Sequence, residues 1–198
     1  DNFEFVKEFT CDCGKKHSTQ VDDVIVEKGA INRIPEVVAR YNAKKVFVLA
    51  DENTYRAAGE KVCAILEDKG IAYTKFVFVG ESPEPEEFAV GSCMMHYDSF
   101  CDMIMAVGSG VINDIGKIVA NVTNHPYVIV GTAPSMDGYA SATSSMTRNG
   151  LKVSIPSKSA GVIIGDVDIL KNAPMEMLVS GLGDMLAKYI SIAEWRIS

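Results

Sequence analysis

The sequence predicts an α/β fold in which a Rossmann-like parallel sheet with helices on both faces is followed by the start of an all-helical second domain. Short apolar runs alternate with helical patterns over residues 24–130, as in consecutive βαβ units. These runs lack polar alternation, which indicates strands that are buried on both faces. A helical signal from about Val167 onward predicts the second domain.

The first third of the chain alternates strand and helix. Val24–Val26 is a short apolar strand, and a helical pattern runs from Ile31 to Tyr41. Lys45–Ala50 is a continuous apolar strand. Asn53 is expected to cap the next helix, because an Asn side chain can accept a hydrogen bond from an unpaired amide. Gly70 is expected to end that helix near Lys69.

The middle of the chain repeats the alternation. Residues 73–79 are expected to form a strand, and residues 84–97 a helix after a proline-containing loop. Residues 103–107 are a fourth buried strand, followed by a helix over about 112–122, and residues 127–130 are a fifth strand. Right-handed crossovers then place helices on both faces of the sheet. Ligands of such sheets bind beyond the carboxyl ends of the strands.

The pattern changes after the fifth strand. Residues 131–150 are rich in Gly, Ser, Thr and Ala and have almost no apolar periodicity. They are therefore predicted to form a long loop, and loops of that length are usually functional or disordered. Two further short strands are expected at 151–155 and 161–164.

The domain boundary is predicted near residue 166. Residues 1–166 would form a nucleotide-binding α/β domain, and residues 167–198 the first helices of a truncated helical domain for metal and substrate. The last helix is expected to start near Gly183. No Gly or Pro stop signal follows it by Ser198, so the chain is expected to break off inside this second domain.

Composition excludes several classes of protein. The chain has 198 residues, 47% hydrophobic and 23% charged, which is ordinary for a globular domain with a sizeable core. The net charge is −7 and there is no basic run, which argues against nucleic acid as a partner. This charge is still compatible with one phosphorylated ligand, because a glycine turn at a helix N-terminus binds phosphate without Lys or Arg.

The sequence predicts neither a membrane span nor a signal peptide. No apolar stretch reaches the roughly 18 residues that span a bilayer, so no membrane span is expected. The first residues, Asp1-Asn2-Phe3-Glu4, lack the basic start and apolar run of a signal peptide, so a cytoplasmic location is the default expectation. The five cysteines are an odd number and are interpreted as reduced thiols.

The first candidate site is a glycine turn, Gly108–Ile112, between a buried strand and a helix. Unpaired amides at a helix N-terminus attract phosphate, and glycines allow it to approach closely. Asn113 occupies the sixth position, so the G-x-G-x-x-G fingerprint is not met, and a tight turn without a ligand explains the spacing equally well. Asp114 is expected to be a favourable first-turn acid, and Lys117 could be a solvated surface residue.

Asp51 is the second candidate, at the end of the strand Lys45–Ala50. A carboxylate at that point can accept hydrogen bonds from the adenosine ribose and would repel a 2′-phosphate, which favours NAD over NADP. The alternative is that Asp51 caps the helix that follows, and local chemistry does not separate the two roles.

Two further acids lie in the second half of the chain. Asp137 is a lone carboxylate in the small-residue segment Thr132–Ser141 and could bind a substrate hydroxyl. Its alternative role is an Asx-turn to Gly138. Asp184 lies in the segment Gly181–Lys188 and could be a metal ligand, and its alternative role is an ordinary N-cap.

Taken together and in this order, these segments resemble the iron-containing alcohol dehydrogenase superfamily, which also includes dehydroquinate synthase. Within it, the chain most resembles the sn-glycerol-1-phosphate dehydrogenases. The match rests on Gly108–Asp114, on Thr132–Ser141 and on Gly183-Asp184 with Lys188. The N-terminal Cys11-Asp12-Cys13-Gly14, with His17, also resembles the start of the bacterial members. The resemblance extends over essentially the whole chain, but over only one half of a full-length member.

The resemblance implies a role for each candidate residue. The cofactor-binding residues would be Asp51, Gly108, Ser109, Gly110, Val111, Ile112, Thr132, Ala133, Pro134, Ser135 and Ser141. Of these, Asp51 would contact the ribose, the glycine turn would hold the pyrophosphate, and the later residues would line the path of the adenine and nicotinamide. Asp137 and Asp184 would bind substrate and take part in catalysis.

Asp184 would also be the first ligand of one divalent metal ion, zinc, nickel or iron. The family's other two ligands are histidines of the C-terminal domain, before which this sequence stops. None of the three histidines present, His17, His96 and His125, stands at a plausible ligand position for that metal. Cys11, Cys13 and His17 could form a separate small metal site from three tightly spaced ligands.

The implied function is reversible, metal-assisted reduction of dihydroxyacetone phosphate to sn-glycerol 1-phosphate with NAD or NADP, NAD being favoured. The partner is a small phosphorylated polyol or ketone, and the full-length enzyme would be a homo-oligomer. Three alternatives stay open: a glycerol or other polyol dehydrogenase, a dehydroquinate synthase-like lyase, and a non-catalytic nucleotide-binding fragment. The lyase would need a richer set of Lys and Arg residues around Asp184 than Lys188 alone supplies.

Overall fold

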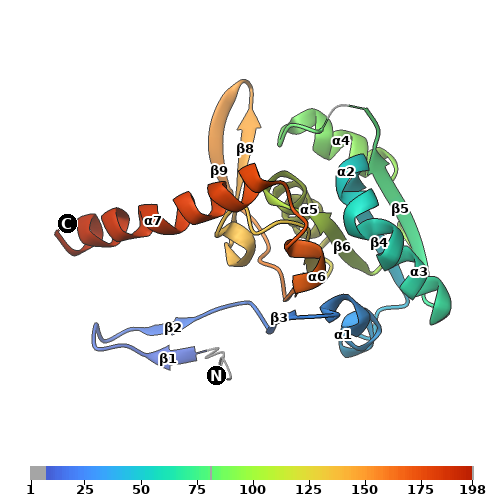
Figure 1. Ribbon diagram of the computed structural model, residues 1–198, viewed down its shortest axis with the longest axis horizontal. Helices are drawn as coiled ribbons and strands as arrows, with labels where there is room; N and C mark the ends of the chain where they lie inside the picture. The colour runs from blue at the N-terminus through green and yellow to red at the C-terminus, as the bar shows by residue number, and fades with distance from the viewer. Residues whose placement is uncertain (1–7, 81, 198) are drawn as a thin grey trace.

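The computed structural model describes residues 8–80 and 82–197, and the N-terminal residues expected to lack a signal peptide lie outside this part. Its centre is a six-stranded sheet in which every neighbouring pair of strands is parallel. In spatial order the strands are β3 (Asp23–Glu27), β10 (Val162–Asp166), β7 (Tyr127–Gly131), β6 (Met103–Gly108), β4 (Lys45–Asp51) and β5 (Ala72–Phe78) (Figure 1). The predicted parallel sheet is confirmed.

Helices cover both faces of the sheet, as predicted. One face carries η1 (Ala30–Arg33), α1 (Ile34–Arg40), η2 (Tyr55–Gly59) and α3 (Glu60–Asp68), and the other carries α4 (Glu87–Met95) and α5 (Gly110–Thr123). Side chains alternate along the strands: Val46 and Val48 pack toward the first set of helices, and Phe47 and Leu49 toward the second. Both sets are fully buried, which explains why the strands lack polar residues.

The strand order changes direction between β4 and β6. After β4 the chain moves outward to the edge strand β5, and it then returns to β6 on the other side of β4. In an open parallel sheet, ligands bind outside the carboxyl ends of the strands at such a switch point. Asp51 is the last residue of β4 and the glycine turn begins at the last residue of β6, so both candidates lie at this edge.

The helix after β4 begins two residues earlier than predicted. Asp51, not Asn53, is the N-cap of α2 (Glu52–Thr54): the Thr54 amide donates to Asp51 Oδ1 at 2.8 Å, and the Asp51 amide donates to Thr54 Oγ1 at 3.0 Å. The prediction of Asn53 was wrong because this reciprocal capping box satisfies two unpaired amides at once.

Residues 131–150 are not the long loop that their composition predicts. They contain the short helix η3 (Gly138–Ala140) and the strand β8 (Thr143–Arg148), which pairs with β9 (Leu151–Pro156) as an antiparallel hairpin. Asn149 and Gly150 form its turn with φ of 51° and 74°. An Asn-Gly pair favours this turn because both positions need positive φ.

The C-terminal segment is helical, as expected, but its long helix starts earlier. After α6 (Val167–Leu170), α7 runs from Met175 to Ile197, so Gly183 lies in its interior. Asp184 is therefore not an N-cap. Figure 1 shows α7 extending away from the sheet. Of its described residues only Gly181 is buried, and large apolar side chains such as Leu186 and Trp195 are exposed. No described helix combines the length and apolarity needed to cross a membrane.

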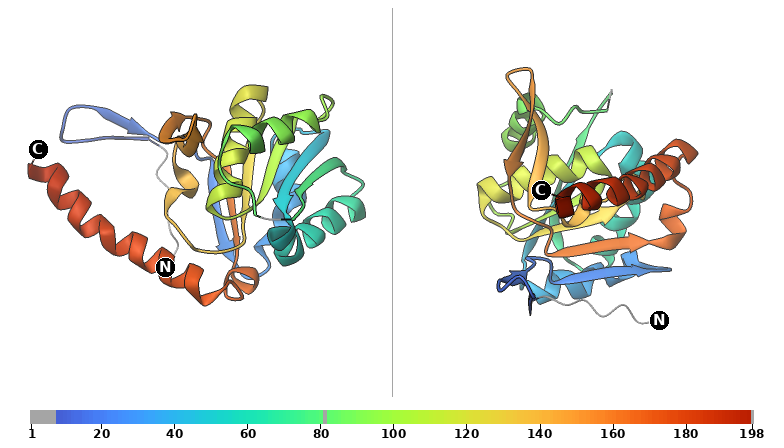
Figure 2. Two further views of the ribbon diagram at one scale, coloured as in Figure 1. Left: turned by 90° about the horizontal axis from the view of Figure 1, so that it is seen from above. Right: turned by 90° about the vertical axis from the view of Figure 1, so that its left-hand side faces the viewer.

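A second hairpin precedes the sheet. Within the described part of the chain, β1 (Glu8–Thr10) and β2 (Lys16–Ser18) pair only with each other, and all six residues are exposed. In the left view of Figure 2 this hairpin projects from the body of the domain. The five cysteines are free thiols, as predicted, and three of them, Cys63, Cys93 and Cys101, are buried.

Candidate functional site

The glycine turn joins β6 to α5, as its sequence predicts. Ser109 is the N-cap of α5, and its side chain makes no capping hydrogen bond. Gly110 is the first residue of the helix and is partly exposed. The amides at this helix end therefore lack an acceptor from the N-cap side chain, and Gly110 lines a cavity described below. This is the arrangement in which a helix N-terminus binds phosphate.

The glycines of this segment have different steric roles. A Cβ on Gly108 would lie 2.5 Å from Ile112 Cβ, so the buried Ile112 side chain already fills that space. A Cβ on Gly110 would meet only Met136 Cγ, at an ordinary 3.7 Å. Gly108 is thus required by packing, whereas Gly110 leaves room above the amides. Val111 is exposed at the helix surface.

Close packing of the helix on the sheet depends on Gly116. A Cβ there would lie 2.8 Å from Tyr127 Oη and 2.9 Å from Ala106 Cβ. In the dinucleotide fingerprint, the third glycine provides this close helix–strand approach. Asn113, at the fingerprint position, is instead fully buried and accepts a 2.9 Å hydrogen bond from Tyr127 Oη on Oδ1. The G-x-G-x-x-G spacing is therefore not met, but Gly116, three residues after the position of the third glycine, takes over its packing role.

Asp114 and Lys117 behave differently from the sequence expectation. Lys117 is 1% exposed, pairs with Asp114 Oδ1 at 2.8 Å and donates to the Thr143 carbonyl at 2.5 Å. It is not a solvated surface residue, because the β8–β9 hairpin covers it. Asp114 is not in the first helical turn, since α5 begins at Gly110. The ion pair lies within α5, and the hydrogen bond from Lys117 to the Thr143 carbonyl joins β8 to the helix that follows the glycine turn.

The segment Thr132–Ser141 begins beside the glycine turn. Gly131 is in register with Gly108, and the Thr132 amide donates to the Gly108 carbonyl at 3.1 Å. Tyr139 Oη donates to the Ala133 carbonyl at 2.6 Å and so closes the segment on itself. Thr132 and Ala133 are buried, and the loop beyond them is partly or fully exposed.

Helix α7 crosses this segment at Gly181. A Cβ on Gly181 would clash with the Pro134 carbonyl oxygen and lie 3.4 Å from Ser135 Cα. Only glycine therefore lets the helix approach so closely. One turn later, Asp184 Oδ2 accepts a 2.8 Å hydrogen bond from the Asp137 amide. The two acids singled out in the sequence lie together although 47 positions separate them.

Lys188 completes this cluster. Its ammonium group pairs with Asp137 Oδ2 at 2.7 Å, which lowers the pKa of Asp137 and raises that of Lys188. The Asp137 side chain therefore does not form the Asx-turn considered as an alternative: it faces α7, and no side-chain hydrogen bond caps η3. Asp137 is held as a carboxylate beside Asp184, ready to accept a hydrogen bond from a hydroxyl group.

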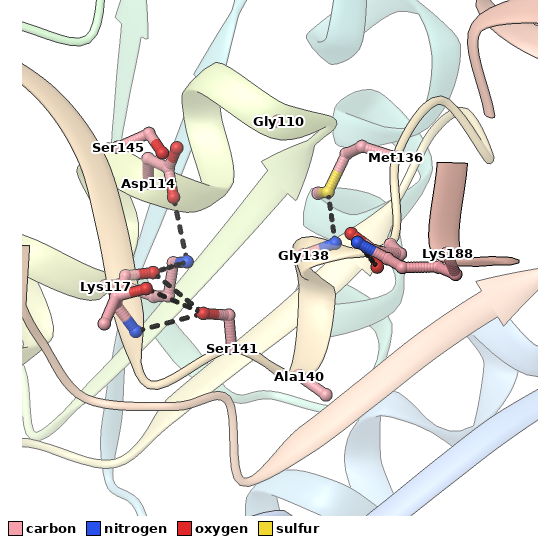
Figure 3. Close-up of a pocket in the computed structure, with 11 residues that line it drawn as sticks. Gly110, Asp114, Lys117, Met136, Gly138, Ala140, Ser141, Ser145 and Lys188 are labelled. Atoms are coloured by element: carbon pink, nitrogen blue, oxygen red, sulfur yellow. Dashed lines mark hydrogen bonds and ion pairs between the residues drawn. The ribbon is translucent and has the colours of Figure 1, made fainter. Parts of the chain in front are cut away.

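A cavity of about 550 Å³ lies between the glycine turn and this cluster (Figure 3). Its lining residues come from α5, the loop, β8 and α7, and are Gly110, Asp114, Lys117, Met136, Asp137, Gly138, Ala140, Ser141, Thr143, Ser145 and Lys188. It brings together the predicted Gly110, Asp137 and Ser141. Sequence reasoning missed Ser145, whose β8 strand lacks apolar alternation, and the lining role of Lys117.

A second cavity, of about 600 Å³, lies beside Thr132 and Ala133. Asn53 and Thr54, from the helix that Asp51 caps, line its other side together with α6 and the start of α7. Asp51 itself uses Oδ1 in capping. The two cavities divide the predicted residues, because Gly110, Asp137 and Ser141 line the first and Thr132 and Ala133 the second.

A family model described as iron-containing alcohol dehydrogenase matches residues 25–174. The chain belongs to the iron-containing alcohol dehydrogenase family. The matched range runs from β3 to the residue before α7 and includes Asp51, the glycine turn and the small-residue loop. The resemblance seen in the sequence is confirmed.

Two curated relatives of the chain have the same name as each other. A glycerol-1-phosphate dehydrogenase (NAD(P)+) of Halalkalibacterium halodurans is 30% identical over 192 residues, which cover 95% of this chain and 48% of that protein. Its counterpart from Bacillus subtilis is 32% identical over 186 residues, with 90% and 46% covered. The chain thus spans about half the length of the curated relatives that it matches.

Solved structures of other dehydrogenases and reductases share the fold. A glycerol dehydrogenase from Schizosaccharomyces pombe superposes with a TM-score of 0.76 at 26% identity, covering 86% of this chain and 43% of that one. A maleylacetate reductase from Rhizobium sp. has a TM-score of 0.68 at 19% identity. The second of these likenesses is one of fold alone.

Proposed function

We propose that this chain forms the nucleotide-binding half of an NAD(P)-dependent, metal-assisted dehydrogenase that interconverts dihydroxyacetone phosphate and sn-glycerol 1-phosphate. The observation that carries the proposal is the Asp137–Asp184 contact beside a cavity that opens onto the glycine turn. The names of the relatives at 30% and 32% identity supply the substrate. Residues 167–198 would be the first helices of the domain that closes the cleft, which accounts for the exposed apolar side chains of α7.

In this proposal the two cavities hold different parts of the dinucleotide. The uncapped amides of Ser109 to Ile112 would bind the pyrophosphate, because the helix end carries a partial positive charge. The adenosine half would occupy the cavity beside Thr132, with its ribose near Asp51. Pro134 and Ser135 would then lie along the path toward the nicotinamide. NAD is favoured over NADP because a 2′-phosphate would approach the Asp51 carboxylate.

The nicotinamide end would lie in the cavity that Asp137, Ser141 and Lys188 line. Asp137 would accept a hydrogen bond from a hydroxyl of the polyol, and the ion pair with Lys188 keeps its carboxyl group ionised. Hydride transfer is the cofactor's chemistry, and the protein contributes the orientation of the two reactants.

Asp184 would supply one ligand to a divalent metal ion. Its carboxylate is a suitable donor for zinc, nickel or iron, and the hydrogen bond from the Asp137 amide occupies Oδ2. Among the described residues no group of three His, Cys, Asp or Glu side chains gathers there, so the remaining ligands would come from other residues. Such an ion, when bound, polarises a carbonyl or alcohol oxygen.

The nucleotide site is tested by calorimetric titration of the 198-residue chain with NAD and NADP. In the Gly110→Ala variant the added methyl makes only an ordinary contact within the protein, so the fold is kept while the space above the amides is reduced. The expected result is a loss of affinity of about tenfold or more. The control is Gly91→Ala in α4, where a methyl group would meet open space. Equal affinity of the two variants would contradict the proposed phosphate position.

The substrate is tested on the longest product of the gene, loaded with zinc or nickel. NADH oxidation with dihydroxyacetone phosphate but not with dihydroxyacetone supports the proposal. The opposite preference indicates the glycerol dehydrogenase activity named for the Schizosaccharomyces pombe structure. A reading frame that continues past Ser198 with two further histidines would supply the missing ligands, whereas a stop codon there would favour a nucleotide-binding module.

A further inference from the structure

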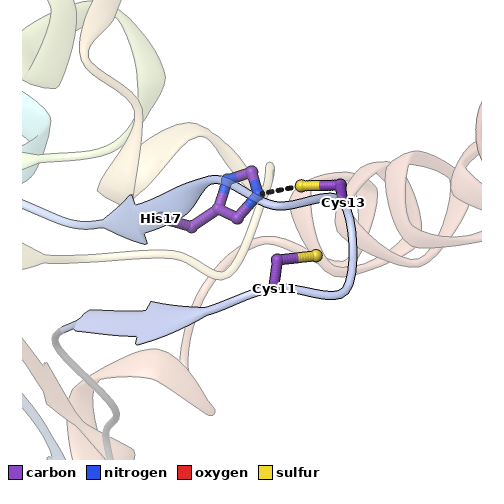
Figure 4. A group of neighbouring side chains, drawn as sticks. All are labelled: Cys11, Cys13 and His17. Carbon is purple, nitrogen blue, oxygen red and sulfur yellow. Dashed lines mark hydrogen bonds between the residues drawn. The ribbon is translucent and has the colours of Figure 1, made fainter.

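Three potential metal ligands gather at the β1–β2 hairpin, away from the two cavities described above. Cys11 and Cys13 lie in the turn and His17 lies on β2 (Figure 4). The two sulfur atoms and a ring nitrogen all lie within 4.8 Å of one another. Cys13 Sγ and His17 Nε2 are already 3.2 Å apart. Neither cavity is lined by any of these residues.

The backbone of the turn brings both thiols to one place. The Cys11 amide donates to the Lys15 carbonyl at 3.0 Å, and the Gly14 amide donates to the Cys11 carbonyl at 2.9 Å. Gly14 has φ of 80°, a value that L side chains rarely adopt.

His17 is oriented from the opposite strand. It is in register with Phe9, and the two rings stack with centroids 5.4 Å apart and planes at 27°. This contact holds the imidazole at the side of the hairpin where Nε2 meets the Cys13 thiol. The three donor atoms therefore come from one short segment, in which hydrogen bonds hold the backbone of the turn and a stacking contact holds the His17 ring.

The spacing suits a small tetrahedral ion. Zinc binds sulfur at about 2.3 Å and nitrogen at about 2.0–2.1 Å, so ligand atoms on a tetrahedral ion lie roughly 3.5–3.8 Å apart. The observed limit of 4.8 Å exceeds this by about 1 Å, which side-chain rotation alone can close. Two thiolates and an imidazole favour zinc over magnesium or calcium, which prefer oxygen donors.

We propose that Cys11, Cys13 and His17 bind one zinc ion, with water in the fourth position. Binding replaces the two thiol protons by two sulfur–zinc bonds, and the protons leave to solvent. The neutral imidazole contributes Nε2. The site differs from the one proposed at Asp184 in residues, place and donor type.

The function of this ion would be to stabilise the hairpin. All six strand residues of β1 and β2 are exposed, and the two strands pair with no other strand among the residues that the structure describes. An isolated two-stranded hairpin is only marginally stable in water. A zinc ion that joins the turn to β2 supplies the cross-link that a hydrophobic core would otherwise provide.

Zinc content is the first test. The 198-residue chain is purified under reducing conditions, given one equivalent of zinc, passed over a desalting column and measured by elemental analysis. The expected ratio is one zinc ion per wild-type chain and per Asp184→Asn chain, and none for Cys13→Ser or His17→Gln. His96→Gln is the matched control, because His96 is an exposed histidine outside the cluster. Zinc retained by both cluster variants, or absent from the wild type, would overturn the proposal.

Two spectroscopic measurements test the ligands and the role. Cobalt in place of zinc is expected to give thiolate charge-transfer absorption and the strong visible bands of a tetrahedral ion, both lost in Cys13→Ser. Zinc is expected to slow hydrogen exchange of the Cys11 and Gly14 amides about tenfold, with no change in β6. A Cys11–Cys13 disulfide in protein kept anaerobic and reduced, detected as a loss of two hydrogens by mass, would exclude zinc binding. Loss of the Asp184 function would leave every one of these results unchanged.

Discussion

The Asp137 amide donates a 2.8 Å hydrogen bond to Asp184 Oδ2, and this contact joins the loop after β7 to helix α7. Lys188, one turn further along α7, forms an ion pair with the Asp137 carboxylate at 2.7 Å. Two polar contacts therefore join the loop to the helix: the loop donates the hydrogen bond in the first, and the helix supplies the cation in the second. Gly181 permits both, since its lack of a side chain lets α7 approach the Pro134 carbonyl.

Gly181→Ala is expected to destabilise the docking of α7. The added methyl would clash with the Pro134 carbonyl oxygen, and overpacking of this kind costs about 1–3 kcal/mol. Gly183→Ala is the matched control, because a methyl group there meets no atom within 4 Å. That variant is expected to gain up to about 1 kcal/mol from helix propensity. Urea unfolding followed by circular dichroism measures both, and equal stability of the two variants would contradict the packing role of Gly181.

Lys188→Met is expected to raise the pKa of Asp137 toward its ordinary value of 3.8, because the ion pair with Lys188 is the main cause of the lowering. A carboxyl group with a depressed pKa stabilises the folded protein above pH 3.8, and this contribution is lost as the pH falls through the lower folded value. Carbon-13 NMR titration of the Asp137 carboxyl measures the shift. Lys171→Met, which removes the pair with Asp168, is the control and should leave Asp137 unchanged. An unaltered Asp137 titration in Lys188→Met would show that the pair does not form in solution.

Lys117→Met is expected to destabilise the domain by about 3 kcal/mol, because it leaves the Asp114 carboxylate without its buried cation. Lys117 is 1% exposed and Asp114 18% exposed, so solvent only partly replaces the lost pair. The Thr143 carbonyl also loses its donor, and we expect the β8–β9 hairpin to exchange its amide protons faster. Chemical denaturation with hydrogen exchange gives both quantities. A loss below about 1 kcal/mol would mean that the pair is as weak as an exposed one.

The central sheet was predictable from sequence because its strands are buried on both faces. Met103–Val107 and Tyr127–Val130 are apolar at every position, and no surface helix produces that pattern. The β8 strand was missed for the opposite reason. Only Ser144 and Met146 of its residues are buried, so no apolar alternation marks it. The signal that could have found it was Asn149-Gly150, a strong hairpin turn.

The candidate site was predictable in part. Asp137 and Asp184 were both assigned to substrate binding through the family resemblance, and the structure places them in contact. The start of α7 was misplaced because Gly181 and Gly183 resemble a helix boundary. Gly181 is in fact an interior position where the neighbouring loop excludes a side chain. Lys117 was misjudged because the hairpin that buries it was not predicted. Both errors arise from tertiary contacts that a local pattern does not record.

The five thiols are expected to fall into two reactivity classes. Burial raises the pKa of Cys93 to about 12 and raises those of Cys63 and Cys101, and a thiol reacts as its thiolate. These three should resist iodoacetamide at pH 8 until the protein unfolds. Cys13 is exposed and Cys11 is only partly buried with a lowered pKa, so both should react within minutes. Peptide mass mapping over time measures each rate. Rapid modification of Cys93 in the folded chain would contradict its burial between α4 and the sheet. The proposed zinc site at the hairpin requires a further result: added zinc, but not added magnesium, protects Cys11 and Cys13 from modification.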